Sequence, residues 1–481
     1  MDLTLLMFLS FFLTFLICYK LLKKSKKLPP GIYSFPIAGA MPWMMIKKKS
    51  LIEIVKDDRK LYGDISRFPI FQHEIVLLNS TSLIKEMLSL EECGGRMGSM
   101  SEWKSDGVPR GLLDPDNTSF WKEQKRFVLK CLRDYGFGKK SEQNIQDEAK
   151  ALINHIIENN DSEQFLIKNV FNISAVNVIW KMVANETFSL ESEEGRKYVE
   201  SIEAVLTKVD PKVSIPLFGK YTTVFKNRVK QANEIKRGLM RIINDHEQSL
   251  DEREPRDLID HYLLAIREGR PGFEKEELVL IIFDLFAAGS ETTSTTLRWA
   301  VLYLILNPEI QRRCQQELDQ VENKYPGLSD MEVLPYCQAV ILEVLRVGST
   351  APGTLIHRAK RRVEIGGYQF SKDTLFIGNF MSTHFDPQYW DDPHQFIPER
   401  FLDGEGNVVK DFPHFFPFSR GKRVCLGESL ARTELFIFLT AILKNLRLSV
   451  AENHPAPNPE EFQILITKIP APFFCKIDER I

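Results

Sequence analysis

The residues most capable of chemistry gather in the stretch FFPFSRGKRVCLGESLAR, which spans residues 415–432. Its one cysteine stands in the spacing Phe-x-x-Gly-x-Arg-x-Cys-x-Gly, and five fixed positions make a chance match in a chain of this length roughly a one-in-ten-thousand event. The fixed positions are Phe418, Gly421, Arg423, Cys425 and Gly427. Glycines let the backbone approach a flat group closely, and the arginine can bind an anion.

Cys425 has two interpretations. A free cysteine is usually a small buried hydrophobic residue. Here, however, Arg423 and the start of an amphipathic helix just after the cysteine both favour the thiolate form. No general base lies beside Cys425 in the sequence, so a metal ligand is a better interpretation than a nucleophile.

A second candidate site lies on a long apolar helix predicted over Glu274–Leu306, which Pro308 terminates. Its apolar residues lie on nearly all faces, so it should cross a core. Its middle is unusual, because Gly289 costs about 1 kcal/mol relative to alanine and Glu291 places a carboxylate in a buried element. Either hydroxyl side chains bend a core helix around one satisfied acid, or Glu291 and Thr292 form a pair that relays protons.

Two shorter motifs are weak on their own. Glu343 and Arg346, in EVLR, share a helical face at a spacing of three residues, as many surface ion pairs do. Arg400, in PERF, follows a loop rich in aspartate and proline.

Composition sets the broad class. The chain has 481 residues, of which 43% are hydrophobic and 27% charged, an ordinary globular balance with room for a large core. The net charge of −2 gives no whole-chain argument for nucleic-acid binding. Its cysteines are scattered and form no zinc-type pair, which argues against a disulfide framework and for a reducing compartment. They are Cys18, Cys93, Cys131, Cys314, Cys337, Cys425 and Cys475.

The N-terminus predicts a membrane anchor. Residues 3–19 carry no charge, lysines follow, and the stretch can just span a thin bilayer, which favours the endoplasmic reticulum. A cleaved signal peptide fits less well because no small-x-small site follows, and a surface helix fails because the run has no polar face. The positive-inside rule places everything after the lysines in the cytosol. We expect an anchor over 1–22, a basic and Pro/Gly-rich linker over 23–39, and one domain over 40–481.

Helical periodicity dominates the rest of the chain, which has no repeat and no second long linker. The predicted helices cover Trp121–Leu132, Glu142–Glu158, Val229–Leu250, Glu274–Leu306, Pro308–Glu322 and Leu334–Val347. Strand-like runs come late, at Arg362–Phe370 and Thr374–Met381, and a Gly-Gly pair in the first suggests a hairpin. The expected fold is a single large domain, mainly α-helical with small β-sheets.

Taken in order, A-G-x-E-T on the long helix, E-x-x-R, P-E-R-F and the cysteine motif resemble a cytochrome P-450, a haem-thiolate monooxygenase. The resemblance covers the chain from Leu28. The stretches PRDLIDHYL (255–263) and TTLRWAVLYL (295–304) are similar to the animal microsomal group, which includes steroid- and drug-oxidising members. The resemblance implies haem b as the cofactor, and insertion of one oxygen atom from dioxygen into an apolar molecule.

The resemblance implies a role for each candidate residue. Cys425 would be the axial ligand of the haem iron, with Phe418 packed near its sulfur. Glu291 and Thr292 would handle dioxygen and proton delivery. A buried structural triad, which fixes the loop under the haem, would consist of Glu343, Arg346 and Arg400.

The haem propionates would be bound by residues from several parts of the chain. Arg423, His357 and Trp121 match contacts of the family. The family pattern around the tryptophan is Trp-x-x-x-Arg, and this chain has Lys125 at the last position, which shares the helical face but lacks the bidentate fork of arginine. Arg96 matches a further contact loosely, because CGGRMGSM departs from the usual pattern.

The outer face of the helix that starts at Trp121 is basic. It carries Lys122, Arg126, Lys130 and Arg133. This is either a solvated face or a docking patch for an acidic electron donor. The resemblance implies an NADPH-dependent flavoprotein reductase as the donor, and it also allows a small haem protein.

The substrate is expected to be lipophilic, whether a steroid, fatty acid, terpenoid or xenobiotic, because the segments without a clear pattern are mostly apolar. These segments are Cys93–Thr118, Val199–Tyr221, Phe283–Ala288, Gly348–Leu355 and Pro470–Phe473. Two rival functions remain open. One is a haem-thiolate isomerase or dehydratase without need of dioxygen, against which the Glu291–Thr292 pair counts, and the other is a non-catalytic haem or lipid carrier.

Overall fold

The computed structural model describes residues 59–98, 108–135, 139–159, 164–207, 222–464 and 466–480, except for residues 72, 109 and 410. Before residue 59 it describes residues 10, 12, 14, 28–32, 39, 40, 42 and 46. The chain forms two compact units. The sheet unit comprises residues 1–97, 353–383 and 420–423, and the helical unit comprises residues 98–352, 384–419 and 424–481.

The sheet unit is built around a five-stranded sheet of order β1-β2-β8-β5-β3. Its strands are β1 (Ile65–Arg67), β2 (Ile75–Leu78), β3 (Gly95–Arg96), β5 (His357–Arg358) and β8 (Leu375–Gly378). β2 and β8 are parallel although they lie far apart in the sequence, and the other pairs are antiparallel. All four residues of β2 are buried, as in a strand that is covered on both faces.

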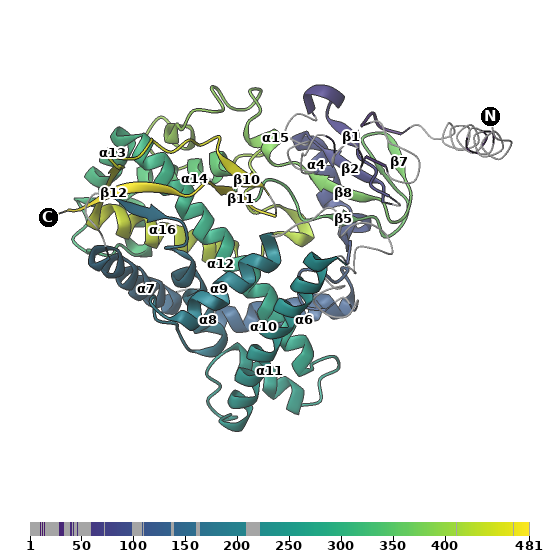
Figure 1. Ribbon diagram of the computed structural model, residues 1–481, viewed down its shortest axis with the longest axis horizontal. Coiled ribbons are helices and arrows are strands. Elements are labelled where there is room, and N and C mark those ends of the chain that lie inside the picture. The colour runs from purple at the N-terminus through teal and green to yellow at the C-terminus, as the bar shows by residue number, and fades with distance from the viewer. Residues whose placement is uncertain are drawn as a thin grey trace, which may run out of the picture. The chain divides into compact units, whose positions relative to one another are not determined.

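Short elements complete the sheet unit (Figure 1). They are α4 (Thr81–Ser89), η1 (Glu91–Gly94), β6 (Val363–Ile365), β7 (Tyr368–Phe370), η6 (Gly421–Arg423) and α15 (Met381–His384), whose last residue belongs to the helical unit. β6 and β7 form the predicted hairpin. Gly366 and Gly367 make its turn with φ of 59° and 76°, which glycine adopts without strain.

Helices make up most of the helical unit. They are α6 (Ser119–Tyr135), α7 (Lys139–Glu158), α8 (Asn172–Ala184), α9 (Glu193–Thr207), α10 (Thr223–Gln248), α11 (Leu258–Arg267), α12 (Lys275–Leu306), α13 (Pro308–Leu318), η4 (Leu328–Val333), α14 (Pro335–Gly348), η5 (Pro398–Phe401) and α16 (Glu428–Asn445). Asp257 caps α11 by accepting from the backbone N–H of Asp260, and Pro308 opens α13 where its missing N–H costs nothing.

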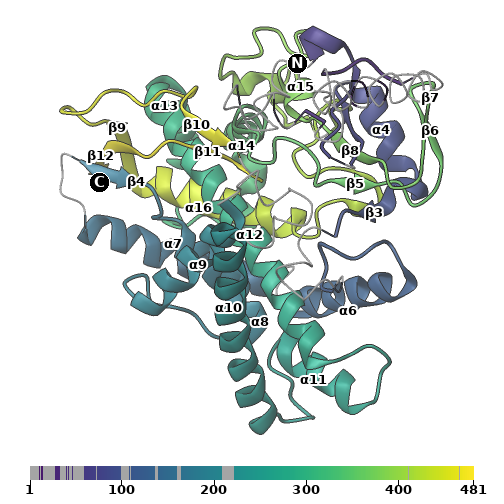
Figure 2. The ribbon, with the colours of Figure 1, turned by 45° about the vertical axis from the view of Figure 1, so that its right-hand side comes forward.

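α12 is the central helix of this unit. It packs against α8, α10, α14 and α16, as Figures 1 and 2 show from two directions. The approach of α8 is close because Gly289 has no side chain, and a Cβ added there would lie 2.1 Å from the Cδ1 of Ile179. The predicted core helix is therefore present, and its glycine is a packing feature.

The helical unit also contains two small sheets, whose strands come mostly from the C-terminal part of the chain. β4 (Phe165–Ile167), β12 (Phe473–Glu479) and β9 (Leu446–Val450) form a three-stranded sheet in that order, and β10 (Phe462–Ile464) pairs with β11 (Lys468–Pro470). All of these pairs are antiparallel. The prediction of a mainly helical fold with small sheets is confirmed.

The described part of the chain contains one helix, α12, that is long and apolar enough to cross a membrane. Most of that helix is buried inside the protein, as in the core helix of a globular domain. Most of the predicted anchor over residues 1–22 lies outside the described residues.

Candidate functional site

Cys425 lies just before α16, whose N-cap is Gly427. The backbone N–H of Cys425 donates to the carbonyl oxygen of Phe418 at 2.9 Å, which closes the loop between these two residues. Gly421, in the part of this loop that belongs to the sheet unit, has φ of 78°, and a Cβ there would lie 2.5 Å from the carbonyl oxygen of Leu88. Only glycine suits this position, which explains one of the fixed positions of the motif.

The Cys425 side chain is exposed, whereas Cys93, Cys131, Cys314, Cys337 and Cys475 are buried. Burial is nevertheless the largest influence on the pKa of the Cys425 thiol and raises it, although the backbone N–H of Gly427 partly offsets this. The side chain can be exposed and its pKa still be raised by burial if one side of the sulfur is accessible and protein atoms surround its other sides. The protein alone therefore favours the neutral thiol, where the sequence predicted a thiolate, and a metal cation bound to the sulfur would displace the proton.

α12 has a narrow accessible stripe on an otherwise buried surface. Between residues 277 and 305 every residue is buried except four. These four, which we call the α12 stripe, are Leu285, Ala288, Gly289 and Thr292. Their spacings of three, one and three residues put them on one face of the helix. Ala288 is exposed and Thr292 is half-buried, so the helix surface is accessible at these two residues, whereas Ile179 of α8 lies against Gly289.

The predicted acid–hydroxyl pair lies at one end of the α12 stripe. The Thr292 hydroxyl donates to the carbonyl oxygen of Ala288 at 2.8 Å, so its oxygen can still accept a hydrogen bond. Glu291 is buried, and its Oε1 accepts from the Thr295 hydroxyl at 3.2 Å. The Thr296 hydroxyl donates to the Thr292 carbonyl at 2.8 Å, in the manner of residues that bend helices. Both predicted interpretations of this segment therefore have support in the same helix.

Glu434 on α16 is a buried acid that the sequence analysis missed. The neighbour of Thr292, Thr293, donates its hydroxyl to Oε2 of Glu434 at 2.8 Å. Burial raises the pKa of Glu434 to about 8, which the bond from Thr293 lowers only in part. A single acid in an amphipathic helix looks like an ordinary surface residue in the sequence, so Glu434 can be recognised as unusual only from its buried position in the structure.

The structure brings the predicted structural triad together. Arg346 and Glu343 are fully buried and form two hydrogen bonds of 2.7 and 2.6 Å. Arg400 Nε lies 3.5 Å from Oε1 of the same glutamate. Arg346 also donates to the carbonyl oxygens of His384 and Pro393 at 2.8 and 2.7 Å. The triad thus holds the backbone that leads towards the cysteine loop.

Trp121 and Lys125 lie one turn apart on α6. The Lys125 ammonium lies 5.1 Å from the centroid of the Trp121 ring, a cation–π contact. The Trp121 indole N–H donates to the carbonyl oxygen of Leu112 at 2.9 Å. Residue 112 is itself fixed, because Asp284 of α12 accepts from the backbone N–H groups of Leu112 and Leu113 at 2.7 and 3.0 Å. The tryptophan therefore connects α6 to a loop that α12 anchors.

The sheet unit gathers Arg96, His357 and Arg423. Arg96 on β3 pairs directly with His357 on β5, and Nη2 of Arg423 donates to the carbonyl oxygen of Gly94 at 3.1 Å. Nδ1 of His357 lies 2.8 Å from the carbonyl oxygen of Cys93. Burial, followed by the charge of Arg96, lowers the pKa of His357 to about 3. The charges of Arg96 and Arg423 both act on His357, and such guanidinium groups stabilise a carboxylate.

The basic outer face of α6 is exposed in the structure. The exposed residues are Lys122, Arg126, Lys130 and Arg133. Exposure is what both a solvated face and a docking patch require, so it leaves the two interpretations equal.

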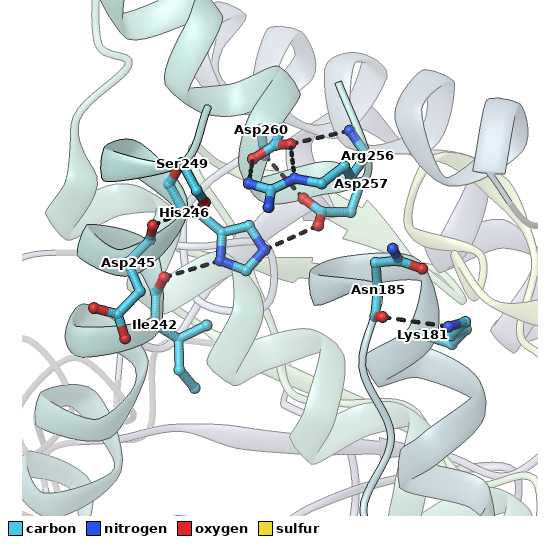
Figure 3. Close-up of polar contacts among 9 residues, drawn as sticks. All are labelled: Lys181, Asn185, Ile242, Asp245, His246, Ser249, Arg256, Asp257 and Asp260. Carbon is cyan, nitrogen blue, oxygen red and sulfur yellow. Dashed lines mark hydrogen bonds and ion pairs between the residues drawn. The ribbon is translucent and has the colours of Figure 1, made fainter. Parts of the chain in front are cut away.

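A second polar cluster joins α10 to α11 (Figure 3). His246 places Nδ1 2.9 Å from the Ile242 carbonyl oxygen and Nε2 2.9 Å from Asp257, and Arg256 forms two hydrogen bonds with Asp260 at 2.7 and 2.9 Å. Both neighbours of the imidazole are acceptors, so both ring nitrogens carry protons. Burial lowers the pKa of His246, but the bond to Asp257 and its charge outweigh this and raise it. Two cations and two carboxylates balance, which makes the cluster a structural ion network.

The mainly helical fold and an accessible cysteine just before a helix match the class of haem-thiolate enzymes, and the comparison with known families shows that class. The chain belongs to the cytochrome P450 family, since the family model "Cytochrome P450" matches residues 29–477. It is an oxidoreductase of the monooxygenase type.

Similar proteins cover nearly the whole chain. Cytochrome P450 2L1 of Panulirus argus is 35% identical over 96% of this chain and 97% of its own length. Cytochrome P450 2C5 of Oryctolagus cuniculus is 35% identical over 88% of each chain. Cytochrome P450 2J2 of Homo sapiens is 33% identical over 90% of this chain and 88% of its own length.

The cofactor of this family is haem b with its iron. The residues present suit it in three respects. The thiol of Cys425 is accessible, as a residue that would bind the haem iron must be. The α12 stripe is accessible at Ala288 and Thr292, on a helix that is otherwise mostly buried. In the sheet unit, the guanidinium groups of Arg96 and Arg423 are suited to carboxylate groups, whereas the neutral His357 ring directs Nδ1 to the Cys93 carbonyl oxygen and leaves Nε2 as an acceptor.

Proposed function

We propose that this chain is a membrane-anchored monooxygenase that inserts one oxygen atom from dioxygen into a lipophilic small molecule. Its electrons come from an NADPH-dependent flavoprotein reductase. The observation that carries the proposal is the accessible Cys425 thiol, at the end of a loop closed by its own hydrogen bond to Phe418.

Haem ligated by a thiolate binds and activates dioxygen, and the protein supplies ligands and protons. In our proposal the sulfur of Cys425 ligates the iron, with Phe418 beside it. Gly421 and Gly427 allow the loop to approach the macrocycle. The carboxylates of the haem are held by several cationic or N–H groups. Arg96, Arg423 and Lys125 would bind them as cations. His357 and Trp121, which the family resemblance also assigns to this role, donate their N–H groups to the carbonyl oxygens of Cys93 and Leu112 and would have to release these bonds to bind a carboxylate.

The proton chemistry is assigned to α12. The Thr292 hydroxyl, fixed by its bond to the Ala288 carbonyl oxygen, accepts a hydrogen bond from a water molecule. Glu291 beside it supplies the acid that replaces the proton. The triad of Glu343, Arg346 and Arg400 has no contact with substrate in this scheme, and it holds the chain that leads to the cysteine.

The partners follow from the surface and the N-terminus. The exposed basic residues of α6 form the docking patch for the acidic reductase, or for a small haem donor, by charge complementarity. Residues 1–22 anchor the protein in the membrane of the endoplasmic reticulum, and the remainder faces the cytosol. The mostly apolar segments named above favour a lipophilic substrate.

The test of this proposal is the absorption spectrum of the ferrous carbonyl complex. Wild-type protein reconstituted with haem should show the strongly red-shifted Soret band of thiolate ligation. Cys425→His should lose this band even if haem stays bound. The matched control is Cys131→Ala, which removes a buried thiol of the same unit and should keep the band. A red-shifted band that survives in Cys425→His would refute the assignment of the ligand.

A further inference from the structure

His384, at the end of α15, forms hydrogen bonds through its carbonyl oxygen and both ring nitrogens. It is fully buried. Its carbonyl oxygen accepts from Arg346 at 2.8 Å. Its Nδ1 lies 2.9 Å from the hydroxyl oxygen of Ser349, and its Nε2 accepts from the backbone N–H of Phe416 at 3.1 Å. Residues that the sequence places far apart are thereby joined through one imidazole.

The directions of these hydrogen bonds are fixed by chemistry. A backbone N–H can only donate, so Nε2 of His384 must be the acceptor for Phe416. The proton of the neutral ring therefore sits on Nδ1 and is donated to Ser349. The Ser349 hydroxyl in turn donates to the carbonyl oxygen of Arg346 at 2.6 Å. A second ring proton would face the N–H of Phe416, and burial and the charge of Arg346 lower the pKa of His384 to about 3.

The residue held by this imidazole begins a short bonded path to the cysteine. The carbonyl oxygen of Phe416 accepts from the backbone N–H of Ser419 at 3.1 Å, and that of Phe418 accepts from Cys425 at 2.9 Å. Pro417 lies between them and restricts the backbone further. Phe416 is thus tied to α14 on one side and to the start of the cysteine loop on the other.

Without Nε2 of His384, the N–H of Phe416 would be a buried donor with no acceptor at that position. Such a group is costly, and the backbone around it moves to find a partner. Only Pro417 separates Phe416 from Phe418, whose carbonyl oxygen accepts from Cys425. A movement of Phe416 would therefore also move the cysteine loop. The predicted triad is not sufficient to prevent this, because Arg346 binds carbonyl groups and makes no bond to Phe416 among the described contacts.

We propose that His384 is a positioning residue, which fixes the backbone of Phe416 through Nε2 and thereby holds the cysteine loop in the geometry that keeps Cys425 on the haem iron. The inference rests on the proposed function for the identity of the ligand. The position of the hydrogen bond does not depend on it.

Two substitutions separate the two ring nitrogens. In His384→Gln the amide oxygen lies where Nε2 was and can accept from Phe416. In His384→Asn the amide reaches Ser349 and leaves Phe416 without its acceptor. We expect the thiolate-type Soret band of the ferrous carbonyl complex to decay at least about tenfold faster in the Asn variant, the size of effect that one lost buried hydrogen bond produces, and within about threefold of wild type in the Gln variant.

Amide hydrogen exchange of the segment around Phe416 is a second measurement, and it does not depend on the haem spectrum. The Asn variant should lose protection there by about tenfold relative to the Gln variant. If His384→Asn does not fold, Ser349→Gly replaces it, since glycine suits the φ of 41° at this position and removes the group that orients the ring. That variant should also decay faster than the Gln variant.

The outcomes are distinct. Equal decay and equal exchange in the Gln and Asn variants, or in the Gln and Ser349→Gly variants, would overturn the role of His384. A wild-type protein without the red-shifted band would refute the proposed function, and the exchange experiment would still decide whether Nε2 holds Phe416. Equal losses of thermal stability with unequal decay would support positioning over a purely structural effect.

Discussion

At the scale of single residues, the role proposed for Thr292 is to hold a water molecule. Its hydroxyl donates within the helix and its side chain lies on the α12 stripe. Thr292→Ala should keep haem binding and the carbonyl spectrum but release much of the consumed NADPH as hydrogen peroxide. A fall in product of about tenfold to a hundredfold, or about 1.4–3 kcal/mol of barrier, is usual for a proton-delivery group.

The measurement is product and peroxide per NADPH consumed. The control is Thr293→Ala, which removes a hydroxyl that points to Glu434 and should lower stability more than coupling. Unchanged coupling in Thr292→Ala would reduce Thr292 to a residue that bends the helix. Turnover of substrate by the wild type without dioxygen would favour an isomerase.

Glu434 makes a prediction about pH. Its pKa is raised from 4.5 to about 8, so the folded protein keeps a proton that the unfolded chain releases. Its contribution to stability is therefore complete below pH 4.5 and is lost as the pH rises through about 8. Relative to Glu434→Gln, the wild type should lose up to about 1.4 kcal/mol of unfolding free energy per pH unit in this window.

Unfolding in urea at several pH values would measure this difference. Glutamine still accepts from Thr293, so the packing is preserved. Parallel curves for the wild type and Glu434→Gln would show that Glu434 is ionised in the folded protein.

These residues differ in how well sequence could find them. Cys425 and its neighbours stand at fixed spacings, and spacing is visible in one chain. His384 and Glu434 act through Phe416 and Thr293, which are distant in sequence, so only the folded chain shows the pairs. The thiol of Cys425 was predicted to ionise readily, and burial, which spacing does not reveal, acts in the opposite direction.

At the scale of elements, Gly289 sets the distance between α12 and α8. Alanine is better than glycine in a helix by about 1 kcal/mol. A Cβ at 289 would lie 2.1 Å from Cδ1 of Ile179, and overpacking of a core costs about 1–3 kcal/mol. We therefore expect Gly289→Ala to be neutral or destabilising by up to about 2 kcal/mol.

A double-mutant cycle tests whether contact with Ile179 causes the expected destabilisation by Gly289→Ala. Ile179→Val removes the clashing methyl group, so the double variant should be more stable than the sum of the singles by at least about 0.5 kcal/mol. Gly238→Ala in α10 is the matched control, because a Cβ there meets nothing closer than 3.6 Å. It should gain about 0.5–1 kcal/mol. Additive effects at positions 179 and 289 would exclude the contact as the reason.

Most long helices were predictable, and several elements were not. α12 and α14 lie within about two residues of their predicted bounds, because their ends carry prolines and their cores are apolar. α8 was missed because twelve of its thirteen residues are buried, which leaves no alternation of apolar and polar faces. β3 and β5 have two residues each, too short for any period, and their pairing crosses most of the chain.

At the scale of the whole molecule, the cysteine motif belongs to both units. Phe418 lies in the helical unit, residues 420–423 in the sheet unit, and Cys425 again in the helical unit. The prediction of one domain over 40–481 remains a prediction.

The anchor can be tested by deletion. Removal of Met1 to Lys27 should release the protein from membranes at high salt, because a span of about 20 apolar residues supplies most of the binding. Some binding through the apolar stretch SIPLFG (214–219), which lies outside the described residues, is expected at low salt. Sedimentation with vesicles measures both. A truncated form that binds as tightly as the full chain would show that residues 1–22 are not the main anchor.

The exposure of Cys425 has a consequence for labelling. The truncated chain lacks Cys18, and of its six remaining cysteines five are buried. A maleimide should therefore modify one sulfur per folded chain before the cofactor is added, and none once the iron occupies that sulfur. The fraction of chains labelled at Cys425 therefore equals the fraction that lacks the cofactor. Mass spectrometry can measure this fraction even in a preparation too turbid for optical spectroscopy.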